Sequence, residues 1–320
     1  MMMAGCSNSD KPAYLEPHLI TTEATHITRT EATLNGSATI EGETEMPKLL
    51  FRYGTSESMD LNTSEVHAQG ADVSLVLTGL KAGTTYYYML QGNNGRITTT
   101  SNMMSFTTLP NMSPKLTSAT LLSHGPMSAF VSYEITDDGG EPMTETGCYV
   151  YQTGELENKQ KYIIENFDGK EGKIKLRIGN LERNAHYEFQ SFARNTVGET
   201  IGTAIKYNTS DAITLNETGE LTQLMGNHLY DYTQLTIAGT LNGEDLSCLR
   251  LMMGRDNNNA STPGKLSDIV LTDVHLAAGG MVGPYHHEAA ENQIVQGTFA
   301  GCEKLIVEIM RRGVGAVVDL

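Results

Sequence analysis

Apolar and polar residues alternate along much of the first two thirds of the chain, a pattern typical of half-buried β-strands. Val73, Leu75 and Leu77 alternate in this way and are followed by Leu80 and Tyr86. The same order recurs 101 residues later without a gap, in Ile174, Leu176, Ile178, Leu181 and Tyr187. A recurrence in one register with the same flanking strand predicts two copies of one β unit.

Each copy also carries a leucine that is followed six residues later by a tyrosine. This is the spacing of a tyrosine corner, in which the phenol crosses between two sheets and its hydroxyl bonds to the main chain. Leu80 with Tyr86, and Leu181 with Tyr187, are therefore predicted structural pairs. Because side chains alternate along a strand, Tyr87 is expected to point outward alone, which gives no aromatic platform for a sugar.

Residues 17–110 and 111–210 resemble fibronectin type III domains. The resemblance is carried by Leu80–Tyr86 (LKAGTTY) and Leu181–Tyr187 (LERNAHY), and by short strands separated by turn signals such as Asp168-Gly169. It implies two immunoglobulin-like β-sandwiches in tandem. The chain has no Trp, so the tryptophan of the family's second strand is missing. We expect the following residues to fill that core volume: Leu34 in the first unit, and Val131 or Phe130 in the second.

Residues 211–320 have a different pattern. Apolar residues at helical spacing predict a short amphipathic helix over 219–230. Further on, two pairs of apolar residues stand 20 residues apart, namely Leu249 with Leu251 and Ile269 with Leu271. Together with Phe299-x-x-Cys302-x-x-Leu305, this spacing resembles the first repeats of Bacteroides-type surface leucine-rich repeat proteins. The resemblance implies an α/β segment, which we expect to be incomplete; the alternative is a third small α+β domain.

The first 16 residues resemble the lipobox and tether of a bacterial lipoprotein. In Met3-Ala4-Gly5-Cys6 two small residues precede a cysteine, and the resemblance implies that Cys6 carries a lipid. The sequence departs from that pattern, because Met3 stands where leucine is usual and the charged and apolar regions of a signal peptide are missing. A start codon placed too late explains this departure. The alternative is a chance run of small residues before a free cysteine.

Charge and cysteine spacing exclude several kinds of partner. The formal net charge is −16, so no basic surplus exists to neutralise nucleic-acid phosphates. No run of 18 apolar residues occurs. The four cysteines, Cys6, Cys148, Cys248 and Cys302, stand far apart without the spacing of a zinc site. We therefore expect no metal and no cofactor.

Few residues suggest catalysis, so we expect that this chain is not an enzyme. The side chains of His286-His287-Glu288 diverge and lack the i, i+4 spacing of a zinc motif. The run Asp256–Asn259 lacks the alternation of a calcium loop and is interpreted as a flexible insertion. Asp137-Asp138 is assigned to a glycine-rich hairpin turn. No nucleophile-elbow, phosphate-loop or dinucleotide motif is present.

These observations predict a lipid-anchored, non-catalytic protein of the cell surface or outer membrane. The two sandwiches are expected to act as a spacer, and the last segment to bind an extracellular protein or glycan, with the chain monomeric. Two alternatives remain, an accessory glycan-binding or scaffold subunit of a surface nutrient-uptake system, and a purely structural stalk. The sequence identifies no binding residues.

Overall fold

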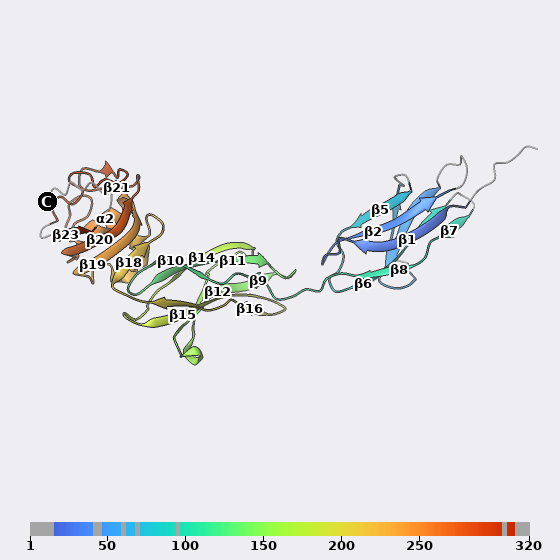
Figure 1. Cartoon of the computed structure of the whole chain (residues 1–320), viewed down its shortest axis with the longest axis horizontal. Helices are drawn as coiled ribbons and strands as arrows, with labels where there is room; N and C mark the ends of the chain where they lie inside the picture. The colour runs from blue at the N-terminus through green and yellow to red at the C-terminus, as the bar shows by residue number, and fades with distance from the viewer. Residues whose placement is uncertain are drawn as a thin grey trace, which may run out of the picture. The chain divides into compact units, whose positions relative to one another are not determined.

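The computed structural model describes residues 16–40, 47–58, 62–67, 71–93, 97–302 and 306–310 (Figure 1). The protein is mainly β, as predicted. It divides into two compact units, Met1–Met112 and Ser113–Leu320. Cys6, the predicted lipid-attachment residue, lies outside the described residues.

The first unit is a sandwich of two antiparallel sheets. Its strands are β1 (His18–Thr25), β2 (Ala32–Thr39), β3 (Lys48–Gly54), β4 (Asn62–Val66), β5 (Asp72–Leu77), β6 (Thr85–Asn93), β7 (Thr98–Thr100) and β8 (Met104–Thr107). One sheet has the order β1-β2-β5, and the other has the order β4-β3-β6-β7, with β8 also paired to β6. Between them lies a core that includes Leu34, Phe51 and Tyr88, each 0% exposed. Leu34 is thus buried, as the sequence predicted.

The second unit begins with another sandwich of the same strand order. Its elements are β9 (Lys115–Leu116), β10 (Thr120–His124), β11 (Ala129–Asp137), β12 (Met143–Gln152), the 3-10 turn η1 (Leu156–Asn158), β13 (Gln160–Ile163), β14 (Gly172–Ile178), β15 (His186–Asn195), β16 (Glu199–Ile201) and β17 (Ile205–Asn208). One sheet contains β14-β11-β10 and the other contains β13-β12-β15-β16, with β17 paired to β15. Apart from the short strand β9, which pairs with β11, this order matches the first unit, as expected for a duplicated unit.

The residues after 211 form a parallel extension of the second unit. Their elements are β18 (Ala212–Leu215), α1 (Leu221–Met225), the 3-10 turn η2 (Gly226–His228), β19 (Gln234–Leu241), α2 (Gly243–Met252), β20 (Asp268–Leu276), β21 (Met281–Val282), β22 (His287–Glu288) and β23 (Ile306–Met310). The strands β18, β19, β20 and β23 pair in parallel, each with the next. The helix predicted over 219–230 is present but shorter, as the five residues of α1 followed by the 3-10 turn η2.

The predicted period of 20 residues is wrong. Ile269 and Leu271 lie on β20, but Leu249 and Leu251 lie in α2. The parallel strands instead pair Ala212 with Thr236 and Gln234 with Asp268, which are offsets of 24 and 34 residues. Among the described residues the parallel strands therefore follow no constant period.

A capping box explains why α2 is a helix. The Asn242 side chain accepts the backbone N–H groups of Glu244 and Asp245, at 3.0 and 3.3 Å. The Asp245 carboxylate accepts the Asn242 N–H in return, at 3.0 Å. These bonds satisfy amide groups that the first turn of a helix leaves without partners. The sequence Asn242-Gly-Glu-Asp245 carries this signal, and it favours a helix where the leucine spacing alone predicts a strand.

Candidate functional site

The two predicted tyrosine pairs have the same geometry in both sandwiches. The backbone N–H of Lys81 donates to the Tyr86 hydroxyl at 2.9 Å. In the second sandwich the N–H of Glu182 donates to the Tyr187 hydroxyl, also at 2.9 Å. Each donor directly follows its leucine, Leu80 or Leu181, and both leucines are buried. The hydroxyls therefore tie the corner loop to strand β6 or β15, which is the arrangement of a tyrosine corner.

A threonine completes each corner, and its role was missed in the sequence. Thr108 Oγ1 accepts the N–H of Thr84 at 2.9 Å and donates to the carbonyl of Lys81 at 2.6 Å. Thr209 repeats both bonds 101 residues later, with Ala185 at 2.8 Å and Glu182 at 2.7 Å. The signal that could have found it is the match of Thr108 to Thr209 in the same register as the tyrosines.

The second sandwich and the parallel extension share one sheet. The edge strand β10 pairs antiparallel with β18 through His124 and Thr214, and β18 then begins the parallel series (Figure 1). Phe130 on β11 is 5% exposed and packs into the hydrophobic cluster of the extension together with Ile213 and Leu224. Val131, the next residue, is 0% exposed in the sandwich core. Of the two residues proposed for the missing tryptophan, Val131 is therefore the one that occupies the sandwich core.

Polar contacts reinforce this junction. The Ser123 hydroxyl donates to the carboxylate of Glu220 and accepts the N–H of Asn216 at 2.8 Å. Lys175 forms ion pairs with Glu220 and with Glu217, the latter at 2.6 Å. Glu220 is 6% exposed. Its two partners, Ser123 and Lys175, both belong to the sandwich and provide polar contacts for this nearly buried carboxylate.

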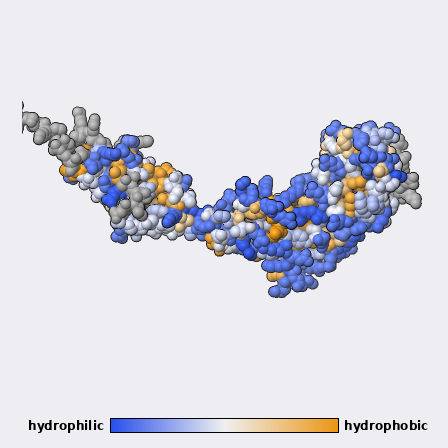
Figure 2. Space-filling model, turned by 180° about the vertical axis from the view of Figure 1, so that it is seen from behind, coloured by the Kyte–Doolittle hydropathy of each residue, from blue (hydrophilic) through white to orange (hydrophobic). Residues whose placement is uncertain are grey.

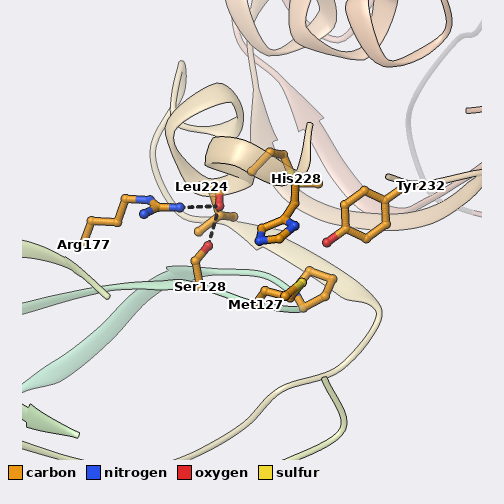
Figure 3. A pocket seen from close by; sticks show the side chains of 8 residues that line it. Met127, Ser128, Arg177, Leu224, His228 and Tyr232 are labelled. Carbon is orange, nitrogen blue, oxygen red and sulfur yellow. Dashed lines mark hydrogen bonds between the residues drawn. The ribbon is translucent and has the colours of Figure 1, made fainter. Parts of the chain in front are cut away.

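The end of α1 is held by a second group of hydrogen bonds (Figure 3). The carbonyl of Leu224 accepts from the Ser128 hydroxyl and from Arg177 Nη2, at 3.3 Å for the latter. Arg177 Nε donates to the carbonyl of Gln223 at 2.6 Å. The cavity beside these groups, which His228 and Tyr232 also line, holds about 10 Å³. This is room for one water at most, so these residues position the extension and do not form a ligand pocket.

The open face of the parallel sheet carries small, half-buried residues. Leu235 and Ile237 point into the core, at 3% and 0% exposed, whereas Thr236 between them lies on the open face. Ala212 and Val270 flank Thr236 in register on the neighbouring strands. Figure 2 shows a largely hydrophilic surface over this unit with scattered hydrophobic residues.

The candidate catalytic and metal-binding residues of the extension lie in β22 and in the loop after α2. His287 and Glu288 form β22, which pairs with β21, and both are exposed. The run Asp256–Asn259, expected as a flexible insertion, forms a hydrogen-bonded turn: Asp256 Oδ1 accepts two backbone N–H groups, from Asn258 and Ala260, each at 2.8 Å.

The structure also identifies a buried arginine beside this loop, which the sequence did not suggest. Arg250 is 0% exposed. It donates to the carbonyl oxygens of Thr298, Ala300 and Asp256 at 2.8, 3.0 and 2.9 Å. Burial lowers the pKa of the guanidinium. These contacts tie α2 to the loop after it and to the turn near residue 300.

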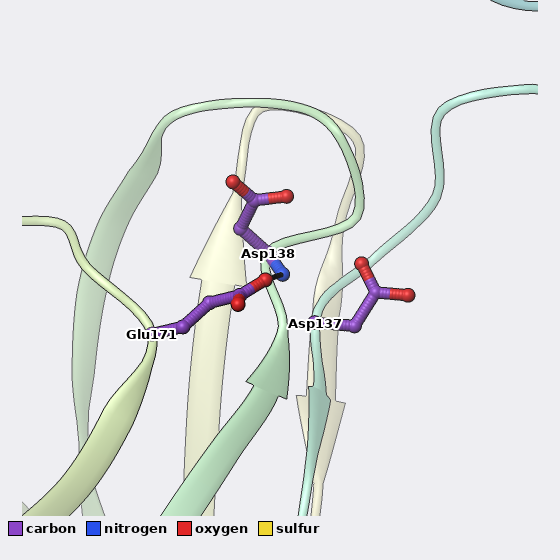
Figure 4. A group of neighbouring side chains, drawn as sticks. All are labelled: Asp137, Asp138 and Glu171. Atoms are coloured by element: carbon purple, nitrogen blue, oxygen red, sulfur yellow. Dashed lines mark hydrogen bonds between the residues drawn. The ribbon is translucent and has the colours of Figure 1, made fainter. Parts of the chain in front are cut away.

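Three carboxylates meet at one end of the second sandwich (Figure 4). Asp137, Asp138 and Glu171 have oxygens within 4.8 Å of one another. Glu171 accepts the Asp138 N–H at 2.7 Å, and Asp137 pairs with Lys115 at 3.4 Å. The carboxylates therefore stabilise the hairpin turn.

A polar groove of about 230 Å³ lies at the other end of the same sandwich. Its lining combines carboxamides and carboxylates with the edges of two buried tyrosines, in Gln152, Asn158, Gln160, Asn180, Glu155, Glu182, Tyr151 and Tyr187. Gln152 Nε2 already donates to Glu182 at 3.0 Å. Such a lining presents hydrogen-bond acceptors and negative charge, but no cation.

Burial raises the thiol pKa of the three cysteines that the structure describes. Cys148 and Cys248 are buried, and burial raises the pKa of each thiol to about 12. Cys302 is half-buried, and burial also raises its thiol pKa. All three are free thiols.

Within the described part of the chain, no helix is long and apolar enough to cross a membrane.

Comparisons with solved structures give distant likenesses. No family model matches the chain, and no curated protein matches it. A segment of two fibronectin type III domains from chicken tenascin is 18% identical and covers 58% of this chain and 97% of its own, with a TM-score of 0.29. Titin domains A168–A170 are 12% identical, covering 61% and 67%, with a TM-score of 0.26. The sensor domain of the anti-sigma factor RsgI4 in Pseudobacteroides cellulosolvens is 23% identical, covering 31% and 99%, with a TM-score of 0.24. The fold assignment therefore rests on the chain's own strand order and paired tyrosine corners.

Proposed function

We propose that this protein is a non-catalytic binding protein of the cell surface. In this proposal the two sandwiches serve as a spacer and the extension after residue 211 meets the ligand, which is an extracellular protein or glycan. Cys6 carries a lipid that anchors the chain to the membrane, and the protein acts as a monomer.

The observation that carries the proposal is the continuous sheet of the second unit. Because β10 pairs with β18, and because Phe130 packs into the core of the extension, the extension has a fixed position on the sandwich. A rigid scaffold that presents a recognition surface lowers the entropy lost on binding. A purely structural stalk does not require a fixed junction at this point, because a flexible linker would serve it equally well. The fixed junction therefore favours presentation of a binding surface.

Binding of the full chain to immobilised matrix proteins and to a glycan array tests this function. Thr236→Arg places a long charged side chain on the open sheet face, and Ser74→Arg is the control at an exposed position of β5 in the first unit. We expect a ligand whose affinity falls about tenfold or more in the Thr236 variant and is unchanged in the control. Equal binding by both variants, or no ligand in either collection, would contradict the proposal.

The anchor is tested separately. In a chain preceded by a complete signal peptide, Cys6→Ser is expected to release the protein from the membrane fraction, because the thiol that accepts the lipid is removed. Cys302→Ser is the control for loss of a thiol elsewhere. Unchanged membrane partitioning of the Cys6 variant would rule out this anchor.

A further inference from the structure

A histidine stands where the second sandwich joins the parallel extension. His124 is the last residue of β10, and it pairs with Thr214 of β18, where the antiparallel strands of the sandwich meet the parallel strands of the extension (Figure 1). On its other side the same residue pairs with Ala129 of β11. The backbone of His124 therefore takes part in the pairing of both parts of the second unit.

The side chain of His124 packs at the end of the sandwich core. Its ring lies against the ring of Tyr207 on β17, with centroids 5.2 Å apart and planes at 60°. Tyr207 is 4% exposed and belongs to the hydrophobic core of the second sandwich. The Tyr207 hydroxyl donates to the carbonyl of Gly125, the residue after His124. The imidazole is therefore held between the junction and a buried aromatic ring.

One nitrogen of the imidazole has no hydrogen bond. Within the described part of the chain, Nδ1 of His124 is buried and has no hydrogen-bond partner. A neutral imidazole carries one N–H group, whereas a protonated imidazole carries an N–H group on both nitrogens and a positive charge. Protonation would therefore bury a charged donor that no acceptor meets, and this costs free energy. The site accommodates the neutral ring.

The strands packed against β10 are β11, β17 and β18. The four residues of β18 include no titratable side chain. β11 meets His124 at Ala129. Further along β11 come its titratable residues, Tyr133, Glu134 and Asp137. On β17, Lys206 is exposed, and Tyr207 stays neutral because burial raises its pKa. Among the described residues, these three strands therefore place no carboxylate beside the imidazole.

A carboxylate of the junction, Glu220, already has partners. It accepts from the Ser123 hydroxyl and forms an ion pair with Lys175. Burial is accordingly the cause that lowers the pKa of His124, without a contribution from a neighbouring charge. A proton on the ring thus has nothing nearby to stabilise it.

We infer that the junction between the second sandwich and the extension is acid-sensitive, with His124 as the residue whose protonation loosens it. This property goes beyond the proposed function and does not depend on which ligand the extension meets. In the unfolded chain the imidazole takes a proton near its ordinary pKa of 6.5, whereas in the folded chain it does so only at lower pH. The contribution of the neutral ring to stability is therefore present above pH 6.5 and is lost as the pH falls below this value.

Hydrogen exchange of the full chain at about pH 7.5 and about pH 5.5 tests the inference, with His124→Gln as a variant whose side chain stays neutral at both values. Comparison of two proteins at the same pH removes the pH dependence of the exchange chemistry itself. Between these pH values the amides of β10 and β18 should lose about three- to tenfold more protection in the unchanged protein than in the variant, the range open to one imidazole.

His186→Gln is the matched control. His186 lies on β15 of the same sandwich, is exposed, and its Nδ1 already contacts Asn208 Oδ1 at 2.6 Å. This variant should lose as much protection in acid as the unchanged protein. An equal acid loss in His124→Gln and the unchanged protein would overturn the inference, and so would disappearance of the loss in His186→Gln.

Titration of the His124 ring by NMR in the unchanged protein supplies a second measurement that needs no variant. We expect the ring to take its proton below pH 6.5, together with loss of protection in β10 and β18. Protonation at or above pH 6.5 would contradict the inference, even if the glutamine variant did not fold.

Discussion

Phe130 and Val131 are neighbours on β11, yet their side chains belong to two different hydrophobic cores. Val131 packs inside the second sandwich, whereas Phe130 packs with Ile213 and Leu224 of the parallel extension. Because side chains alternate across a strand, β11 serves both cores at once. At Phe130 the outward side of β11 thus forms part of the extension's interior, which joins the two parts into one structural unit.

The tyrosine corners allow a paired prediction. Tyr86→Phe and Tyr187→Phe each remove one hydrogen bond from a backbone N–H at 2.9 Å. We expect each change to lower the free energy of unfolding by about 1 kcal/mol. Urea denaturation measures the effect, with Tyr87→Phe as the control. A neutral result at both corners would show that these bonds do not stabilise the sandwiches.

A glycine in β19 gives the sharpest test of the parallel pairing. Gly239 has a φ of +96°, and a Cβ there would lie 1.9 Å from the carbonyl oxygen of Leu215 on β18. Gly154 has a similar φ of +92° but no atom within 4 Å of a Cβ. Gly154→Ala should therefore cost about 1 kcal/mol for backbone strain alone, and Gly239→Ala considerably more because β18 and β19 must separate.

Thermal unfolding of these two alanine variants supplies the measurement. A larger loss for Gly239→Ala, together with faster hydrogen exchange in β18 and β19, is the expected result. Equal losses in the two variants would mean that β18 does not approach β19 this closely.

We predict that the buried thiols of the folded chain resist alkylation. With a pKa near 12 instead of the ordinary 9, the Cys148 and Cys248 thiols form about a thousandfold less thiolate at pH 8. Iodoacetamide should therefore leave both unmodified in the folded chain and alkylate both in guanidinium chloride. Peptide mass spectrometry reads out the modification. Rapid labelling of either residue in the folded protein would contradict its placement in a core.

The sandwiches were predictable because their signals are local and occur twice. Alternation and the spacing from Leu80 to Tyr86 need only nearby residues, and the second copy removes chance matches. The extension was harder, because Leu249 fits either a short strand or a helix and the capping box at Asn242 decides between them. The junction could not be predicted, since no local pattern tells which core a residue such as Phe130 will join. Arg250 was missed for the same reason, because its carbonyl partners lie up to 50 residues away.

Hydrogen exchange of the full chain carrying Phe130→Ala tests the central claim, that the second sandwich and the extension form one rigid unit. Loss of this buried ring should destabilise by about 3–5 kcal/mol. Because β10 and β18 share a sheet, we predict that amides of β10, β18 and β19 lose protection together, while those of β2 and β6 in the first unit do not change. Faster exchange in β18 and β19 with β10 unaffected would show that the extension opens independently and would contradict the claim.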